Sequence, residues 1–158
     1  MKINRVLLAT LAASVVLPAV SYAASPQEGR LFSERHHSAV IAAGAVEQIG
    51  VKLPRGAKIP KVEVLADTSD KGDKVGDWKS CNIETKRCEQ SDVRIVRFHR
   101  GEREGDPEPW QELSVDVANE SGETRAVKLM VTFQPQGGKD LKECRLDTDC
   151  GWSKPATE

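Results

Sequence analysis

The chain has 158 residues, of which 39% are hydrophobic, 30% are charged and only 4% are aromatic. Its 23 basic and 24 acidic residues leave a formal net charge of −1. Proteins that bind DNA or RNA usually carry a marked basic excess, so this balance argues against a nucleic-acid partner.

The first 23 residues have the three-part plan of a secretory signal peptide. Lys2 and Arg5 precede an uncharged apolar run and a short segment of small residues that ends at Ala23, where we expect the cut. The apolar run is shorter than the roughly 20 residues that a membrane-spanning helix needs. The sequence therefore predicts removal of 1–23, no transmembrane anchor, and a location in the bacterial periplasm or outside the cell.

Regular alternation of apolar and polar residues, the mark of a strand with one buried face, recurs along the remaining chain. It occurs at 48–53, 61–66, 113–117 and 127–133. We expect the last two of these strands to pair as a hairpin, because the residues between them are rich in turn formers.

Two other apolar segments have less regular patterns. In the expected strand 93–99 the apolar positions change parity between Ile95 and Val96, which indicates a β-bulge or a strand covered on both faces. The segment 38–46, SAVIAAGAV, fits a buried strand or a short helical turn, because an apolar segment this short does not distinguish the strand period from the helix period.

About six short strands without a long helical period indicate an antiparallel sandwich or barrel. The unit 113–133, LSVDVANESGETRAVKLMVTF, resembles the strand, Asn-containing turn and strand of bacterial immunoglobulin-like and fibronectin-like domains. The resemblance implies an antiparallel β-sandwich and no particular function, because such folds host many activities. We expect a flexible segment at 24–35, a single sandwich domain at 36–134 and a disulfide-tied tail at 135–158.

Four cysteines follow the signal peptide, and an even number in an exported chain predicts disulfides. Three pairings are possible, and we favour the two local ones. Six intervening residues give Cys81 and Cys88 the parity of opposed positions in a hairpin, while Cys144 and Cys150 would close a short loop in the tail. Neither the spacing of a zinc knuckle nor a C-x-x-C redox motif is present.

Metal binding and catalysis have little support in the sequence. The aspartates of 67–77 and 147–149 suggest calcium, but the second group cannot complete an EF-hand loop and lysines interrupt the first. His36 and His37 form a pair without a third ligand at a recognisable spacing. No G-x-S-x-G elbow frames a serine. We predict no metal, no cofactor and no enzymatic activity.

Tryptophans and arginines remain as candidates for a binding surface. Indoles near loops stack on sugars or anchor protein partners, and arginines hold anionic groups. The alternative is that the indoles cap the ends of the fold and that nearby acidic residues balance the arginines. The expected surface consists of Trp78, Arg87, Arg94, Arg97, Arg100 and Trp110.

These observations favour an exported, non-catalytic binding protein of the bacterial envelope. The first hypothesis is a protein-binding accessory or inhibitor, whose contact loop would be 82–87, held between Cys81 and Cys88. The alternative is a module that binds a glycan or another cell-envelope polymer. Asn119 also begins a glycosylation sequon, which has meaning only in a eukaryotic secretory route.

Overall fold

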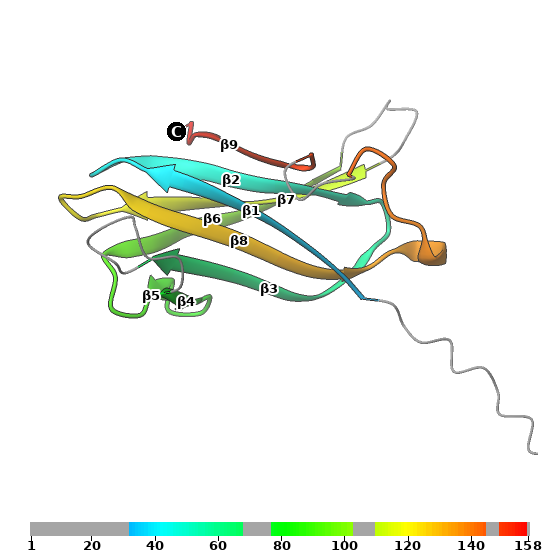
Figure 1. Cartoon of the computed structure of the whole chain (residues 1–158), viewed down its shortest axis with the longest axis horizontal. Helices are drawn as coiled ribbons and strands as arrows, with labels where there is room; N and C mark the ends of the chain where they lie inside the picture. Colours follow the sequence, from blue (N-terminus) through cyan, green and yellow to red (C-terminus); the bar gives the residue numbers. More distant parts are fainter. Residues whose placement is uncertain (1–31, 68–76, 103–109, 145–148, 158) are drawn as a thin grey trace, which may run out of the picture.

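The computed structural model describes residues 32–67, 77–102, 110–144 and 149–157, so the expected signal peptide lies outside the described residues. Within them the chain is all-β and antiparallel, as expected, with one short 3-10 turn (Figure 1). The elements are β1 (Ser33–Ile41), β2 (Val46–Pro54), β3 (Lys58–Asp67), β4 (Trp78–Asn82), β5 (Arg87–Cys88), β6 (Val93–Glu102), β7 (Trp110–Asn119), β8 (Arg125–Gln134), η1 (Gln136–Gly138) and β9 (Gly151–Pro155).

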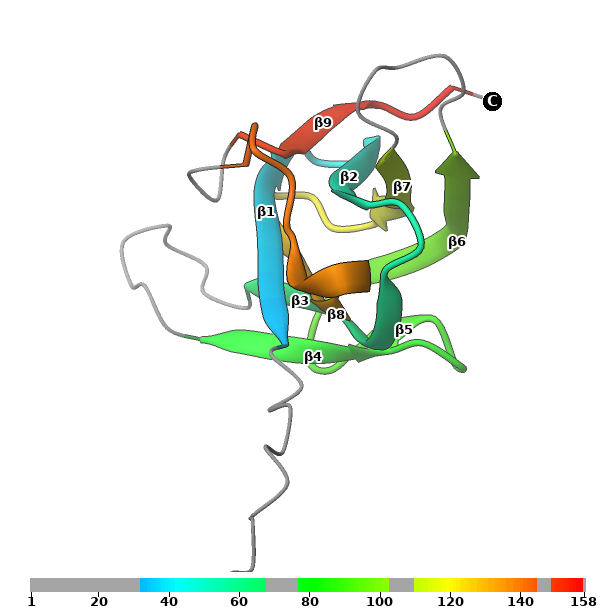
Figure 2. The ribbon, with the colours of Figure 1, turned by 90° about the vertical axis from the view of Figure 1, so that its right-hand side faces the viewer.

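The strands follow the order β1-β8-β3-β4-β5-β6-β7-β2-β9 in one sheet. Seen end-on, this sheet curls into a nearly closed barrel in which β1 returns to the side of β2 and β9 (Figure 2). The order does not confirm an immunoglobulin-like sandwich. Strand β1 begins within the segment expected to precede the domain, and the tail beyond residue 134 contributes β9.

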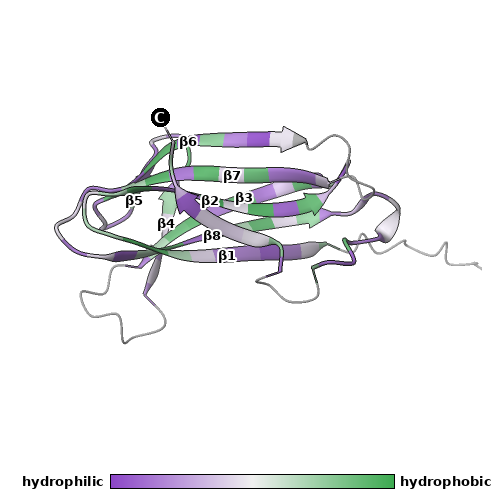
Figure 3. Ribbon diagram, turned by 90° about the horizontal axis from the view of Figure 1, so that it is seen from above, coloured by the Kyte–Doolittle hydropathy of each residue, from purple (hydrophilic) through white to green (hydrophobic). Residues whose placement is uncertain are grey.

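The core of the barrel consists of the inward residues of the alternating strands. Figure 3 shows hydrophobic and hydrophilic bands alternating along β2, β6 and β7. Fully burying one such aliphatic side chain stabilises by roughly 1.5–3 kcal/mol. The fully buried apolar side chains include Ile41, Ile49, Leu53, Val64, Ile95, Val115, Val117, Leu129 and Phe133.

The expected hairpin at 113–133 is wrong, although both of its strands exist. Strand β7 pairs with β6 and β2, whereas β8 pairs with β1 and β3. The connection 120–124 is therefore an arch that carries the chain from one wall of the barrel to the other. The connection 42–45 between β1 and β2 is a second arch, so the ambiguous segment 38–46 is a strand, a turn and the start of the next strand.

One buried amide links the two arches. The side chain of Asn119, in a residue only 1% exposed, donates from Nδ2 to the carbonyls of Ile41 (3.0 Å), Ala42 (3.2 Å) and Glu123 (2.7 Å). Its Oδ1 accepts from the backbone N–H (3.1 Å) and hydroxyl (2.7 Å) of Ser121. The side-chain nitrogen to which a glycan would be attached at a sequon therefore donates hydrogen bonds within the fold.

The parity change in 93–99 is a β-bulge. The register of β6 against β7 shifts between Ile95 and Arg97, which leaves Val96 as the extra residue. Ile95 points into the core before the bulge, and Phe98 packs against the core after it. The shift places Arg97 and His99 on the outward face of the barrel.

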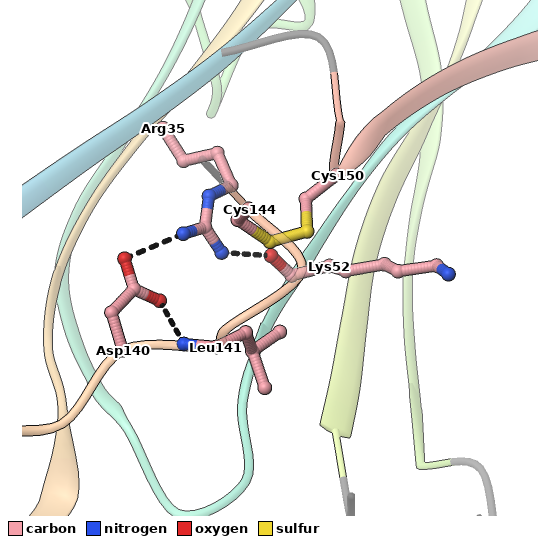
Figure 4. The surroundings of a disulfide bond; sticks show 6 residues. All are labelled: Arg35, Lys52, Asp140, Leu141, Cys144 and Cys150. Carbon is pink, nitrogen blue, oxygen red and sulfur yellow. Dashed lines mark hydrogen bonds and ion pairs between the residues drawn. A yellow bond between two sulfur atoms is a disulfide. The ribbon is translucent and has the colours of Figure 1, made fainter. Parts of the chain in front are cut away.

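Both local disulfides are present, Cys81–Cys88 and Cys144–Cys150, so the predicted pairing is confirmed. The second lies beside a polar contact that closes the gap between β1 and β2 (Figure 4). The Arg35 guanidinium, in a residue 5% exposed, donates to the Lys52 carbonyl and to Asp140, each at 2.6 Å. The Lys52 N–H donates in turn to the Cys150 carbonyl at 2.7 Å. Strands β1 and β2 and the tail are thereby joined.

Replacing Asn119 by alanine should destabilise the protein strongly. The change removes the five hydrogen bonds of a buried side chain, including those to the Ile41 carbonyl and the Ser121 N–H. The carbonyls of Ala42 and Glu123 keep a second donor, in the Ala45 N–H and the Ser121 hydroxyl. Each buried group left unsatisfied costs about 1–3 kcal/mol, so we expect a loss of at least about 2 kcal/mol in the free energy of unfolding, measured by urea denaturation. The control is Asn82→Ala, whose side chain accepts two hydrogen bonds in an exposed turn. Equal losses in the two variants would contradict the role given to Asn119.

Candidate functional site

The outward face of four neighbouring strands, β9, β2, β7 and β6, gathers aromatic, basic and hydrogen-bonding side chains. One row across it runs from Trp152 through Gly50 and Ser114 to His99, each residue in register with the next. We name this surface the tryptophan face. Its members are Gln48, Gly50, Lys52, Arg97, His99, Trp110, Glu112, Ser114, Asp116, Trp152 and Lys154.

The indole of Trp152 lies against the backbone of β2 at Gly50. A Cβ atom at Gly50 would collide with the indole ring, so only glycine permits this approach. A Cβ atom at Gly151 would likewise collide with His37 of β1. Strand β9 is therefore held closely on both sides, and the Cys144–Cys150 disulfide fixes the point at which it begins.

Two lysines of the face lie over its two tryptophans. The Lys52 Nζ is 4.7 Å from the centroid of Trp110, and the Lys154 Nζ is 5.1 Å from that of Trp152. Both distances lie within the roughly 6 Å of a cation–π interaction. In the described part of the chain neither ammonium forms a salt bridge with a carboxylate.

Two adjoining hollows open on the tryptophan face, with volumes of about 270 and 350 Å³. These volumes lie near the lower end of the roughly 300–1,000 Å³ of ligand clefts. Glu112 and Lys154 contribute to both hollows and form their common rim. Gln48, His99, Arg100, Gly101 and Ser114 complete the first, and Lys52, Trp110, Trp152 and Ser153 complete the second.

Asp116 forms a buried ionic anchor next to the first hollow. Its side chain is 3% exposed, and Oδ2 accepts from Arg97 Nε at 2.7 Å and from His99 Nε2 at 2.8 Å. Burial alone would raise the pKa of Asp116, but these hydrogen bonds outweigh burial and leave the pKa below its ordinary value. Among the described residues Oδ1 has no hydrogen-bond partner. The carboxylate orients the imidazole that lines the hollow.

Ser114, His99 and Asp116 lie close together but do not form a nucleophilic relay. The Nε2 of His99 is bound to Asp116, and the Ser114 hydroxyl accepts a hydrogen bond from Gln48 Nε2 at 3.3 Å. A relay requires the base to contact the nucleophile and a third group to orient the base. The arrangement instead provides fixed donors and acceptors at the floor of the hollow.

Three of the six residues expected to form a binding surface lie at or next to the tryptophan face. Trp110 lines one hollow but is only 5% exposed, and Arg97 holds Asp116 beside the other. Arg100 borders the first hollow, but it alternates with the outward His99, and its guanidinium donates to the buried Gln111 at 3.1 Å. The bulge in β6 is what brings Arg97 to this side of the sheet.

The other three lie elsewhere. Trp78 begins β4, at the end of the barrel opposite to Trp110, and the Lys128 Nζ is 4.5 Å from its ring centroid. Arg94 and Arg87 both approach Glu120, at 2.7 and 3.7 Å. The hydrogen bond from Arg94 lowers the pKa of Glu120. The six expected residues therefore do not form one continuous surface.

Sequence reasoning missed the β2 and β9 contributions to the face. Trp152 was not included in the expected surface, and Lys52, Lys154 and Gln48 were not considered. The available signal was Gly50, since a glycine inside a strand pattern often marks the close approach of another group. The sequence alone does not indicate that the approaching group is an indole 102 residues further along the chain.

The paired histidines lie on opposite faces of β1, because successive residues of a strand alternate. His37 contacts the start of β9, and burial, followed by the charge of His36, lowers its pKa. Among the described residues no group of three histidine, cysteine or acidic side chains is placed to hold a metal ion. The aspartates at 70, 73 and 147, considered for calcium, lie outside those residues.

No family model, curated protein or solved structure matches the chain. In the part of the chain that the structure describes, no helix is long and apolar enough to cross a membrane.

Replacing Asp116 by asparagine should reduce stability in a pH-dependent way. Because the pKa of Asp116 is lowered in the folded state, its contribution is present above the unfolded value near 4 and is lost as the pH falls through the folded value. We expect Asp116→Asn to cost about 1–2 kcal/mol at pH 7, since the partly exposed Arg97 weakens the pair. The difference from the wild type should shrink towards pH 3.

Urea unfolding at pH 7, 5 and 3 tests this, with Glu63→Gln as the control because Glu63 pairs with an exposed lysine. An Asp116→Asn cost that stays the same at all three pH values would show that the carboxylate charge is not what stabilises the site.

Proposed function

We propose that the protein is an exported, non-catalytic binding protein of the bacterial envelope, and that its tryptophan face binds a saccharide polymer. The observation that carries this proposal is the partly exposed Trp152 indole beside two adjoining hollows on one outward face, with Trp110, only 5% exposed, behind the second hollow. A pyranose ring presents C–H bonds on its faces and hydroxyl groups around its edge. Aromatic rings pack against the C–H bonds of the sugar faces, and fixed polar groups form hydrogen bonds with the hydroxyl groups.

The polar groups around the indoles match the needs of a hydroxyl-rich ligand. Gln48, Ser114 and Glu112 line the first hollow and offer amide, hydroxyl and carboxylate groups. Glu112 continues into the second hollow, which Trp110 and Trp152 line. Two hollows that share a rim suit consecutive units of a chain better than a single small molecule.

The features at the N-terminus and the cysteines support an exported location. The first 23 residues have the plan expected of a signal peptide. Both cysteine pairs are joined, and oxidising compartments such as the periplasm form and keep disulfides. A saccharide polymer of the envelope would be within reach of a protein in that location.

Protein binding is the second candidate function, and the loop between Cys81 and Cys88 supports it. Asn82 Oδ1 accepts from the backbone N–H groups of Glu84 and Thr85, each at 2.9 Å. Ile83 is 42% exposed at the tip of this loop. A loop that is already rigid loses less entropy on binding. The loop belongs to β4 and β5 and would act separately from the tryptophan face.

Replacing Trp152 by alanine should weaken saccharide binding at least tenfold, because truncation of a tryptophan at the centre of a contact surface typically costs 2 kcal/mol or more. Envelope saccharides that bind the wild type on a glycan array would be titrated by calorimetry against each variant. Gly50→Ala should weaken the same binding, since its Cβ displaces the indole without removing it.

The matched control is Trp78→Ala, which removes the indole at the opposite end of the barrel and should leave affinity unchanged. Equal effects of Trp152→Ala and Trp78→Ala would contradict a site on the tryptophan face. A wild-type protein that binds no envelope saccharide would overturn the proposed function itself.

A further inference from the structure

The tryptophan face carries more positive than negative charge around its hollows. Lys52 and Lys154 line the hollows, while Glu112 is the one carboxylate that lines either of them among the described residues. Asp116 does not offset this charge, because its Oδ2 is committed to Arg97 and His99. The chain as a whole is slightly acidic, with a formal net charge of −1, and without the expected leader, which holds Lys2 and Arg5, 21 basic residues stand against 24 acidic ones. The charge around the hollows is therefore opposite in sign to the net charge of the chain.

The two lysines are positioned so that they can exchange their present partners for an anion. Each ammonium lies over an indole, at 4.7 Å for Lys52 and 5.1 Å for Lys154. A cation–π contact at an exposed site is weaker than a charge-assisted hydrogen bond to an anionic oxygen. A ligand anion would consequently attract the ammonium groups and uncover the Trp152 ring face for stacking.

We propose that the ligand of the tryptophan face is a saccharide chain that bears carboxylate groups. This inference rests on the proposed saccharide-binding function and names the class of saccharide. Lys52 and Lys154 come from neighbouring strands, and Lys154 borders both hollows. The lysines bind the carboxylates, the partly exposed indole of Trp152 stacks on a sugar ring, and a neutral chain lacks the contacts of the lysines.

Two pairs of probes isolate the carboxylate. The first pair is peptide-free peptidoglycan strands and chitohexaose, which share a β-1,4-linked amino-sugar backbone but differ in the lactyl carboxylate on alternate sugars. The second pair is hexagalacturonate and its methyl ester, in which each carboxylate is replaced by a neutral ester with one added methyl group. We expect the acidic member of at least one pair to bind at least tenfold more tightly than its neutral counterpart, by calorimetry at 50 mM salt.

The decisive variant is Lys52→Gln combined with Lys154→Gln. It should lower affinity for the acidic probe at least tenfold and flatten the salt dependence between 50 and 300 mM, because salt screens exposed charges. Affinity for a neutral probe should be unchanged. The matched control is Lys128→Gln, which removes an ammonium that lies 4.5 Å from the Trp78 ring on the outward face of other strands.

The outcomes separate this inference from the proposed function. Equal binding of acidic and neutral probes, abolished by Trp152→Ala, would overturn the carboxylate inference and leave saccharide binding in place. Equal losses from Lys128→Gln and from the double variant would also overturn it, because the effect would then reflect net charge rather than position. If none of the four probes nor any array saccharide binds the wild type, both proposals fail.

Discussion

The architecture depends on the buried amide of Asn119. Two connections, 42–45 and 120–124, cross the same end of the barrel, and this one side chain donates to carbonyl groups at both of them. Buried polar groups that share a partner stabilise one another, so Asn119 couples the placement of the two arches. Once β7 and β8 lie on opposite walls, β7 is free to pair with β2 and β6. The tryptophan face is a consequence of that placement.

Two local irregularities then convert an ordinary sheet surface into a candidate site. The extra residue Val96 turns Arg97 and His99 outward, where both bind the Asp116 carboxylate. The missing side chain at Gly50 lets the Trp152 indole lie against β2. Both departures weaken regular sheet pairing or packing, and such departures are expected where a fold serves a function.

The sequence predicted what depends on local chemistry. Alternation of apolar and polar residues predicted β2, β3, β7 and β8. The parity change in 93–99 indicated a β-bulge as one of two interpretations, and the bulge is present. The spacing of the cysteines favoured the two pairs that are observed. Strand order was not predictable in this way, because turn residues specify that the chain reverses but not which strand it then pairs with. Trp78 and Trp110 both lie beside loops in the sequence, yet they occupy opposite ends of the barrel. The partnership of Gly50 with Trp152 requires knowledge that β9 pairs with β2.

The edge strand β9 is the least secured part of the proposed site. The contacts around the second disulfide anchor it. Five residues paired on one side give little stability alone. Arg35 and the Lys52 backbone hold the tail at the point where the disulfide joins it, so β9 enters the sheet from a fixed position. Loss of that anchor would release Trp152 and Lys154 while the barrel core, built from β1 to β8, stayed buried. Binding at the tryptophan face therefore depends on the tail more strongly than the stability of the barrel does.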